Sequence, residues 1–263
     1  MTRRTRAKRM TAISLTGGAA LSLLGAPAAF AGDADSTGNS SSTDHTQSLQ
    51  TEAGSDPSFT AVGGGVSNNG VAASNTGVVA GEAINVQTGN AHSAGNESTS
   101  QLDQAARISA TGGGTTLLSQ HAFILNAGGA YADTGFNAGD GITTGNAWAL
   151  GNSSHTSVKQ WANIADEGGA LRLVNQGAAV LNLGAAIAET GFNVGETIDT
   201  GNAKATGDIA DTSLEQSADT SGTPTGPIIT NQNELTTNAG LGLANTGFNE
   251  ATGDDSTNDP EED

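Results

Sequence analysis

Apolar and polar residues alternate along much of the chain with a period of two. In the segment "AAVLNLGAAIAET" (178–190), one face carries Val180, Asn182, Gly184 and further small residues, and the other carries larger apolar side chains. Such alternation is typical of a β-strand, and the Thr-Gly step that follows it predicts a turn. A helix would have to tolerate the recurrent glycines, each costing about 1 kcal/mol relative to Ala. The segment is therefore predicted to be a strand that ends at a tight corner.

This strand-and-corner pattern recurs every 56 residues. Residues 107–162 align with residues 163–218 without a gap and share the motifs "TGFN" and "TGNA". A further copy precedes them and a truncated copy follows, so we place the repeats at about 58–106, 107–162, 163–218 and 219–251. Self-similarity at a fixed period is the signature of a stacked repeat architecture. The sequence thus predicts one repeat domain over residues 58–251.

Strands, tight turns and tandem repeats together predict an all-β fold, a repeat β-solenoid similar to a β-helix. We expect each repeat to supply three coils of about 18 to 19 residues, with two longer coils as the alternative. Stacked Asn side chains form amide ladders in such coils, and one equivalent column is predicted at Asn68, Asn126, Asn182 and Asn238. The glycines after Thr are expected to supply the positive φ of the corners, at Gly77, Gly135, Gly191 and Gly247. A column of Phe136, Phe192 and Phe248 is expected to anchor the packing beside the turn.

The first 31 residues have the pattern of a signal peptide. "MTRRTRAKRM" carries five of the nine Lys and Arg residues, a Gly-rich apolar run follows, and "AFA" ends in a small-x-small cleavage pattern after Ala31. The apolar run is shorter than the roughly 18 to 20 residues that span a bilayer. Arg6 stands where the twin-arginine pattern has an apolar residue, which favours the general secretory route and leaves the twin-arginine route open.

Two flanking segments are predicted to be disordered, because they contain too few large apolar residues to fold. They are the Ser/Thr/Gly/Asp-rich residues 32–57 and the acidic tail at 252–263. The rival interpretation, a chain disordered throughout, does not explain why Ile, Leu and Phe recur without gaps at fixed places. The chain has no Cys, so an exported form must gain its stability from repetition rather than from disulfides, or remain partly unfolded.

The chain is strongly acidic, with a net charge of −18. After removal of residues 1–31, only four basic residues would stand against all 27 acidic ones, which gives −23. Such a surface repels nucleic acid and anionic lipid and favours solubility and association with cations. Nucleic-acid binding, and membrane association after signal cleavage, are therefore not expected.

No residue pattern in the chain indicates catalysis. The four His residues fall at different places in the repeat, and Ser, His and Asp occur in no recognisable nucleophile motif. Carboxylates at the corners are better candidates for a ligand, because Ca²⁺ prefers oxygen ligands. The Ca²⁺ candidates are Asp133, Glu189, Asp140 and Glu196. The competing interpretation is that corner Asp and Asn side chains bond only to their own turns.

The repeat "N-x-G-x-A-x-A-x-T-G-x-N", followed by "T-G-N-A-x-A-x-G-N", resembles the Asn/Thr/Gly-rich repeats of secreted actinobacterial proteins that have no assigned activity. A more distant similarity, in "NQGAAVLNLGAA" (175–186), is to curlin-type repeats, whose Gln, Gly, Asn and Ala stack in amyloid solenoids. Neither resemblance implies catalytic or binding residues.

These patterns predict a secreted, non-enzymatic structural or adhesive protein of the cell surface or extracellular matrix. Open strand edges at the ends of a solenoid can pair with another copy, so the expected partners are the protein itself or other surface components. Two alternatives remain: an extracellular Ca²⁺-binding module and a disordered extracellular polyanion. No cofactor other than Ca²⁺ is expected.

Overall fold

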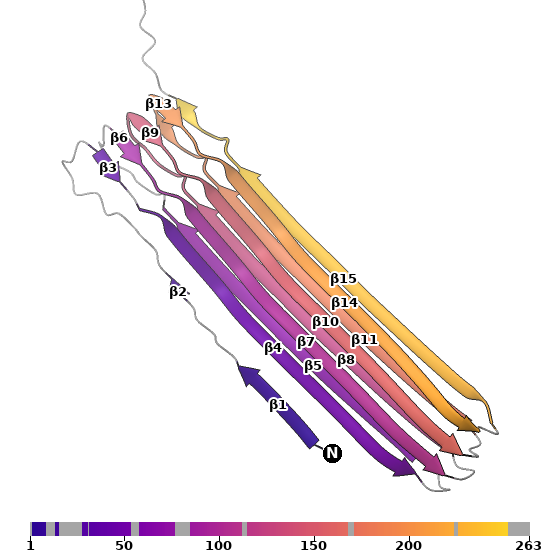
Figure 1. Ribbon diagram of the computed structural model, residues 1–263. Helices are drawn as coiled ribbons and strands as arrows, with labels where there is room; N and C mark the ends of the chain where they lie inside the picture. Colours follow the sequence, from indigo (N-terminus) through magenta and orange to yellow (C-terminus); the bar gives the residue numbers. More distant parts are fainter. Residues whose placement is uncertain are drawn as a thin grey trace, which may run out of the picture.

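The computed structural model shows an elongated body made of long parallel strands that lie side by side (Figure 1). The structure describes residues 2–8, 14–15, 28–30, 32–53, 58–76, 85–111, 115–167, 171–223 and 226–251. All of its secondary structure in these ranges is β-strand. None of the described residues forms a helix long and apolar enough to cross a membrane. The expectation of an all-β solenoid is confirmed.

Two long sheets form the walls of the solenoid. Sheet I has the order β1-β4-β7-β10-β14, with β2 also paired to β4, and sheet II has the order β15-β11-β8-β5. Two short sheets, β13-β9-β6-β3 and β12-β16, lie at the corner where the chain returns from sheet II to sheet I. The strands are β1 (Thr2–Lys8), β2 (Ser14–Leu15), β3 (Ala28–Phe30), β4 (Ala34–Ala53), β5 (Ser58–Asn75), β6 (Asn85–Gln87), β7 (Ala91–Thr111), β8 (Thr115–Asp133), β9 (Gly141–Thr143), β10 (Ala147–Glu167), β11 (Leu171–Glu189), β12 (Val194–Gly195), β13 (Thr197–Asp199), β14 (Ala203–Thr223), β15 (Ile228–Asn245) and β16 (Glu250–Ala251).

Each repeat forms one coil. Asn126 pairs with Asn182, its equivalent 56 residues later, and the same spacing relates β7 to β10 and β10 to β14. The expectation of two or three coils per repeat is therefore wrong. A coil of this size arises because the period-two alternation continues through the internal glycines, so that Gly128 and Gly184 lie inside strands of 19 residues instead of at turns.

The first coil begins earlier than the sequence pattern indicated. The Ser/Thr-rich residues Ala34–Ala53, predicted to be disordered, form β4 and pair with β7. The coils thus start at the sheet I strands, near residues 34, 91, 147 and 203. Strands β1 to β3 fall within the predicted signal peptide, and β1 pairs antiparallel with the outer edge of β4. The predicted tail at 252–263 lies outside the described residues.

The interior alternates between apolar and polar layers along the strand direction. One apolar layer contains Ile108, Leu118 and Ile164, a second contains Leu102, Ile124 and Val158, and a third consists of stacked alanines. Buried glutamines lie between the first two layers, and buried asparagines lie beyond the second. The core is therefore narrow and depends on hydrogen bonding as much as on apolar burial.

The two sheets approach one another most closely at two columns of glycine, here called the waist. In sheet I the waist contains Gly38, Gly95, Gly151 and Gly207, and in sheet II it contains Gly70, Gly128, Gly184 and Gly240. A Cβ atom on Gly128 would overlap the carbonyl oxygen of Gly151 in the opposite sheet. At the waist the backbones of the two sheets are in direct contact, which leaves no room for a side chain on either side.

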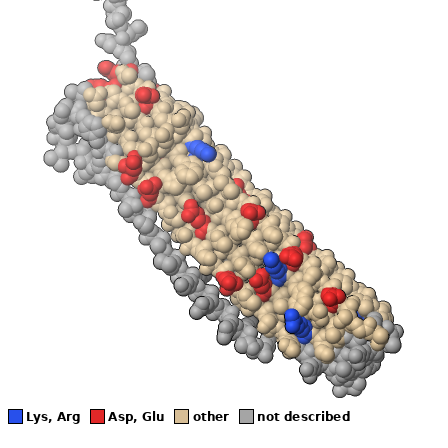
Figure 2. Space-filling model, in the orientation of Figure 1, with Lys and Arg blue, Asp and Glu red and all other residues tan. Residues whose placement is uncertain are grey.

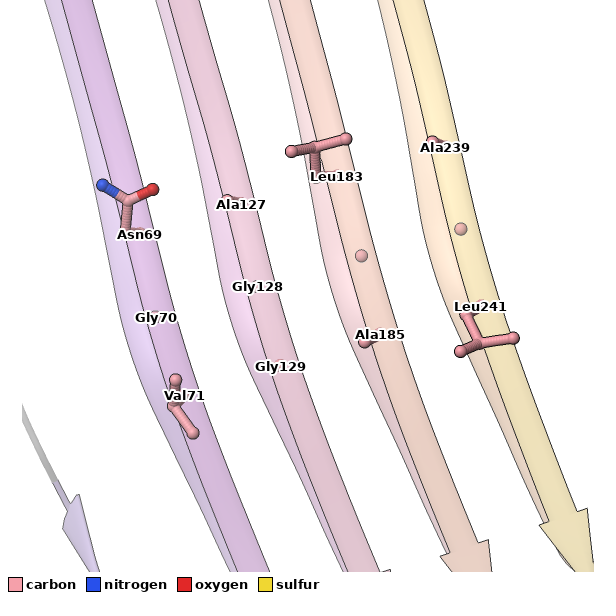
Figure 3. Close-up of a pocket in the computed structure, with 12 residues that line it drawn as sticks. Asn69, Gly70, Val71, Ala127, Gly128, Gly129, Leu183, Ala185, Ala239 and Leu241 are labelled. Carbon is pink, nitrogen blue, oxygen red and sulfur yellow. The ribbon is translucent and has the colours of Figure 1, made fainter.

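The outer face of sheet II carries large apolar side chains. In β11, Val180, Asn182 and Gly184 point inward, whereas Leu181, Leu183 and Ile187 point outward. The strand thus turns its smaller and more polar residues toward the core, because the narrow waist cannot hold leucine. Figure 3 shows that the four sheet II strands bend together at this level, with Leu183 and Leu241 on either side of the glycines.

Candidate functional surfaces

The first candidate feature is a ladder of buried asparagines in sheet II. Asn68, Asn126, Asn182 and Asn238 stack in one column, and each Nδ2 donates to the next Oδ1 at 2.7–2.8 Å. Asn126 is fully buried and also bonds across to sheet I, where it accepts from Ser98 and donates to Thr156, both at 3.1 Å. The column therefore ties the coils together and also ties one sheet to the other.

Parallel ladders run beside this column. Asn39, Asn96 and Asn152 of sheet I donate in turn toward Asp208, and Asn137, Asn193 and Asn249 form a third such row at the corner. All three rows donate toward the C-terminal coil. The glutamine ladders donate in the opposite direction, from Gln216 to Gln160, from Gln160 to Gln104, and from Gln232 to Gln176. These glutamine columns were not among the positions predicted from the sequence.

The corner after sheet II is formed by the "TGFN" motif. Phe136, Phe192 and Phe248 have positive φ values of 60°, 62° and 58°, so Phe takes the left-handed conformation that was expected for Gly. Gly135 and Gly191 are needed for another reason: a Cβ atom on Gly135 would overlap the carbonyl oxygen of Gly191 in the next coil. Gly247 occupies the equivalent corner of the last coil, and Gly77 lies outside the described residues.

The phenylalanine rings form a stack on the surface of the corner. Their centroids lie 4.8 Å and 5.0 Å apart with nearly parallel planes, while Phe136 is 43% exposed and Phe248 76% exposed. A left-handed residue costs about 1–2 kcal/mol, and a pair of packed aromatic rings returns about 0.5–1.5 kcal/mol. The stacking thus offsets part of the backbone strain of the column, and the Phe248 ring is left largely exposed at the end of the stack.

The Ca²⁺ candidates lie in two pairs at the corner. Asp133 is buried and accepts from the Gly135 amide at 2.8 Å and from the Tyr131 hydroxyl at 3.2 Å; that hydroxyl also lies 3.1 Å from Glu189. Burial, opposed by these hydrogen bonds, raises the pKa of Asp133, and burial also raises the pKa of Tyr131.

Asp140 and Glu196 are exposed in successive coils, where the Glu196 amide donates to the Asp140 carbonyl at 2.9 Å. Among the described residues, no group of three acidic, His or Cys side chains has the geometry to hold a metal ion.

The last coil differs from the others in its core columns. Three apolar columns end in threonine: Ile164 is followed in register by Thr220, Val174 by Thr230, and Val180 by Thr236. Two further columns end in an acid, since Ala178 is followed by Glu234 and Asn152 by Asp208. Terminal repeats in stacked proteins carry such polar residues because nothing covers them. The side-chain oxygen Oε1 of Gln216, however, is buried without a hydrogen-bond partner. The ladder thus ends in an acceptor that a further coil would satisfy.

Asp208 is expected to reduce stability at neutral pH. Burial raises the pKa of Asp208, although the hydrogen bond from Asn152 opposes this shift. The folded state therefore binds a proton more tightly than the unfolded state, and stability falls as the pH rises from the ordinary Asp range through the raised pKa. Asp208→Asn should increase the melting temperature at pH 7 by up to about 3 °C, a small effect because the side chain is partly solvated. The increase should disappear below the ordinary Asp pKa, and a gain that persists there would contradict this cause. Asp219→Asn, an exposed change on the same strand, is the control for thermal unfolding.

The outer face of sheet I carries scattered charged pairs. His155 lies 3.0 Å from Asp211, Lys159 lies 3.7 Å from Glu215, and His92 stacks on Trp148 with ring centroids 4.1 Å apart. Figure 2 shows acidic and basic side chains distributed along the face of the rod that is in view. Exposed pairs of this kind contribute little to stability. The four histidines of the sequence lie on different strands or at different levels.

Comparisons with protein-family models, with curated proteins and with solved structures find no significant match to this chain.

Proposed function

We propose that the chain is an exported, non-enzymatic structural or adhesive repeat protein of the cell surface or extracellular matrix, and that it joins end to end with further copies of itself. The observation that carries the proposal is the open end of the last coil. There, β14 and β15 are the edges of the two long sheets, and the Gln216 acceptor is buried and unsatisfied. Unpaired strand edges are templates for a further strand.

The opposite end of the rod presents matching columns. Gln47 occupies the glutamine column that ends at Gln216, and Asn68 occupies the asparagine column that ends at Asn238. In the full chain, β1 lies against β4 and occupies part of this edge. Removal of the predicted signal peptide would uncover β4, so that export and readiness to assemble would be linked.

Charge limits this assembly. The full chain has a net charge of −18, and the open end carries Asp208 and Glu234 in columns that are uncharged in the preceding coil. Cations or added salt reduce repulsion between such ends. We therefore expect assembly to strengthen with salt or with millimolar Ca²⁺.

The experiment compares the chain that begins at Gly32 with the full chain by sedimentation velocity and electron microscopy. The shorter chain should form long particles as salt or Ca²⁺ is added, and the full chain should form fewer. The variant Asp208→Asn/Glu234→Gln should assemble at lower salt, because both changes remove charge from the open end. Asp211→Asn/Asp219→Asn removes the same charge from the outer face of sheet I and should have little effect. Sedimentation that does not change from low salt to millimolar Ca²⁺ would refute the proposal.

A further inference from the structure

The outer face of sheet II is an exposed apolar surface. Large side chains that point away from the core include Phe123, Leu183, Ile187, Leu235, Leu241 and Leu243, which are between 37% and 61% exposed. Monomeric soluble proteins rarely expose a continuous apolar patch larger than a few hundred Å². The apolar patch on this wall lies beside a polar column at Ser119, Asn175 and Asn231, and its extent indicates an interface.

Charge is absent from most of this face. Of the described residues that point outward from sheet II, only Asp133 and Glu189 are acidic and none is Lys or Arg; both acids lie at the corner end of their strands. The basic residues Arg107, Lys159 and Lys204 and the acids Glu97, Asp211 and Glu215 lie on the outer face of sheet I. The rod thus has one charged face and one apolar face.

The last coil shows that the apolar face is independent of the core. Several inward positions change from apolar to polar residues, as at Thr230 and Thr236, whereas most large outward positions stay apolar; Thr237 and Ala239, which follow Leu181 and Leu183, are the exceptions. Leu173 is followed in register by Ile229, Ala179 by Leu235, and Ala185 by Leu241. Packing inside the solenoid cannot account for this pattern, because these side chains point away from it.

The size of the face fits a stable pair of rods. Strands of 19 residues at about 3.3 Å per residue, in a sheet of four strands spaced about 4.8 Å apart, give a face of roughly 1,200 Å². Two such faces in contact would remove roughly 2,400 Å² from solvent, which exceeds the approximately 1,600 Å² of a standard protein interface.

The outer face of sheet II also contains a groove. A groove of about 530 Å³ crosses its four strands at the waist, lined by Gly70, Gly128, Gly184 and Gly240 and flanked by Leu183 and Leu241 (Figure 3). Neighbouring large side chains on the same face can enter a groove of this kind on a facing surface, which is how stacked sheets interdigitate.

We infer that two copies of the chain pair through the outer faces of sheet II, with the charged faces of sheet I turned outward. This arrangement buries the apolar faces and keeps the acidic faces of the two copies as far apart as the rods allow. The contact is lateral and uses no strand edge. It is therefore independent of the end-to-end joining proposed above, which changes the length of an assembly and not its thickness.

The test uses the full chain at low salt, where end-to-end joining is weakest. Sedimentation velocity should give twice the chain mass of 25.9 kDa. Phe123→Lys/Leu183→Lys on the sheet II face should convert the pair to a folded monomer, with folding checked by circular dichroism. Ser157→Lys/Ile209→Lys, which adds the same charge to the sheet I face, should leave the pair intact. Added lysine reduces the net negative charge and so favours association by itself, which means that loss of the pair reports on the apolar contact.

A second measurement does not depend on these variants. The chain has no Cys, so a cysteine introduced as Leu181→Cys should cross-link to its counterpart through a short bismaleimide, whereas Ser157→Cys on the sheet I face should not. Equal cross-linking at both sites, or a monomer at high micromolar concentration, would overturn the inference. A monomer that instead floats with neutral phosphatidylcholine vesicles would overturn it too, and would assign the face to lipid.

Discussion

Gly128→Ala is expected to destabilise the fold by more than about 3 kcal/mol, beyond the usual range for overpacking, because the added atom meets backbone rather than a flexible side chain. The new Cβ would overlap the Gly151 carbonyl oxygen and crowd the Asn96 amide. Relief requires sheets I and II to separate at the waist, which would stretch the cross-sheet bonds of Asn126. A loss of this size is a large part of the 5–15 kcal/mol that stabilises a typical domain.

Gly129→Ala is the matched control, because the two glycines are neighbours in β8 and face opposite sides. A Cβ atom on Gly129 would lie 3.9 Å from a methyl group of Val71 in open surroundings. It should change stability by less than about 1 kcal/mol, and a gain is expected from the lower entropy of the unfolded chain. Urea unfolding monitored by circular dichroism measures both variants. Similar midpoints for the two would show that the sheets are not in backbone contact at the waist.

Asn182→Leu is expected to cost roughly 3–5 kcal/mol, even though leucine has a similar size. Asn182 is fully buried and makes four side-chain hydrogen bonds: it accepts from Asn126 and Ser154 and donates to Asn238 and Thr212. Each buried partner that loses its bond contributes about 1–3 kcal/mol. The partners at the open end of the stack are partly solvated, which keeps the total below a full sum.

The control for Asn182→Leu is Asn175→Leu in the same strand. Asn175 also belongs to an amide pair, since it accepts from Asn231 at 3.0 Å, but that pair is exposed. Water can replace the lost bond, so the change should stay within about 1 kcal/mol. Chemical unfolding that gives equal losses for the two variants would mean that burial does not set the strength of these ladders.

The repeat period and the strand-and-turn pattern were predictable from the sequence. Period-two alternation and gapless recurrence are local properties of the chain, and a parallel stack preserves both. The coil count was not predictable by the same means. Glycine ordinarily marks a turn, and here Gly128 and Gly184 instead mark the level at which two sheets touch. A glycine at a turn and a glycine at the contact between two sheets can be told apart only when the backbone that faces the glycine is known.

The orientation of the strands was also hidden. In the segment 178–190, leucine is among the residue types most often buried, yet Leu181 and Leu183 point outward and Asn182 points into the core. The choice follows from the distance between the sheets, which no single strand specifies. A signal for the first coil did exist: Gln47 follows Asn39 by eight residues, as Gln104 follows Asn96, and these positions stack in the structure. The Ser/Thr-rich composition of β4 concealed it.

The corner shows how one residue can be misassigned while its motif is recognised. The sequence predicts a corner at "TGFN" and favours glycine for its positive φ, since most side chains disfavour that conformation. Phe192 adopts it because the rings of successive coils stack, and Gly191 is kept for contact with the Gly247 carbonyl of the next coil. The positive φ of Phe192 and the need for glycine at position 191 both come from contacts with residues 56 positions away in the sequence.

The opposed directions of the amide ladders affect the electric field along the rod. In an α-helix the peptide dipoles point the same way and leave partial charges at the two ends. Here, the asparagine rows donate toward one end and the glutamine rows toward the other, so their dipoles largely cancel within every coil. The ladders therefore build up no potential difference as coils are added, and the electrostatic limit on a long stack comes from the net negative charge of the chain instead.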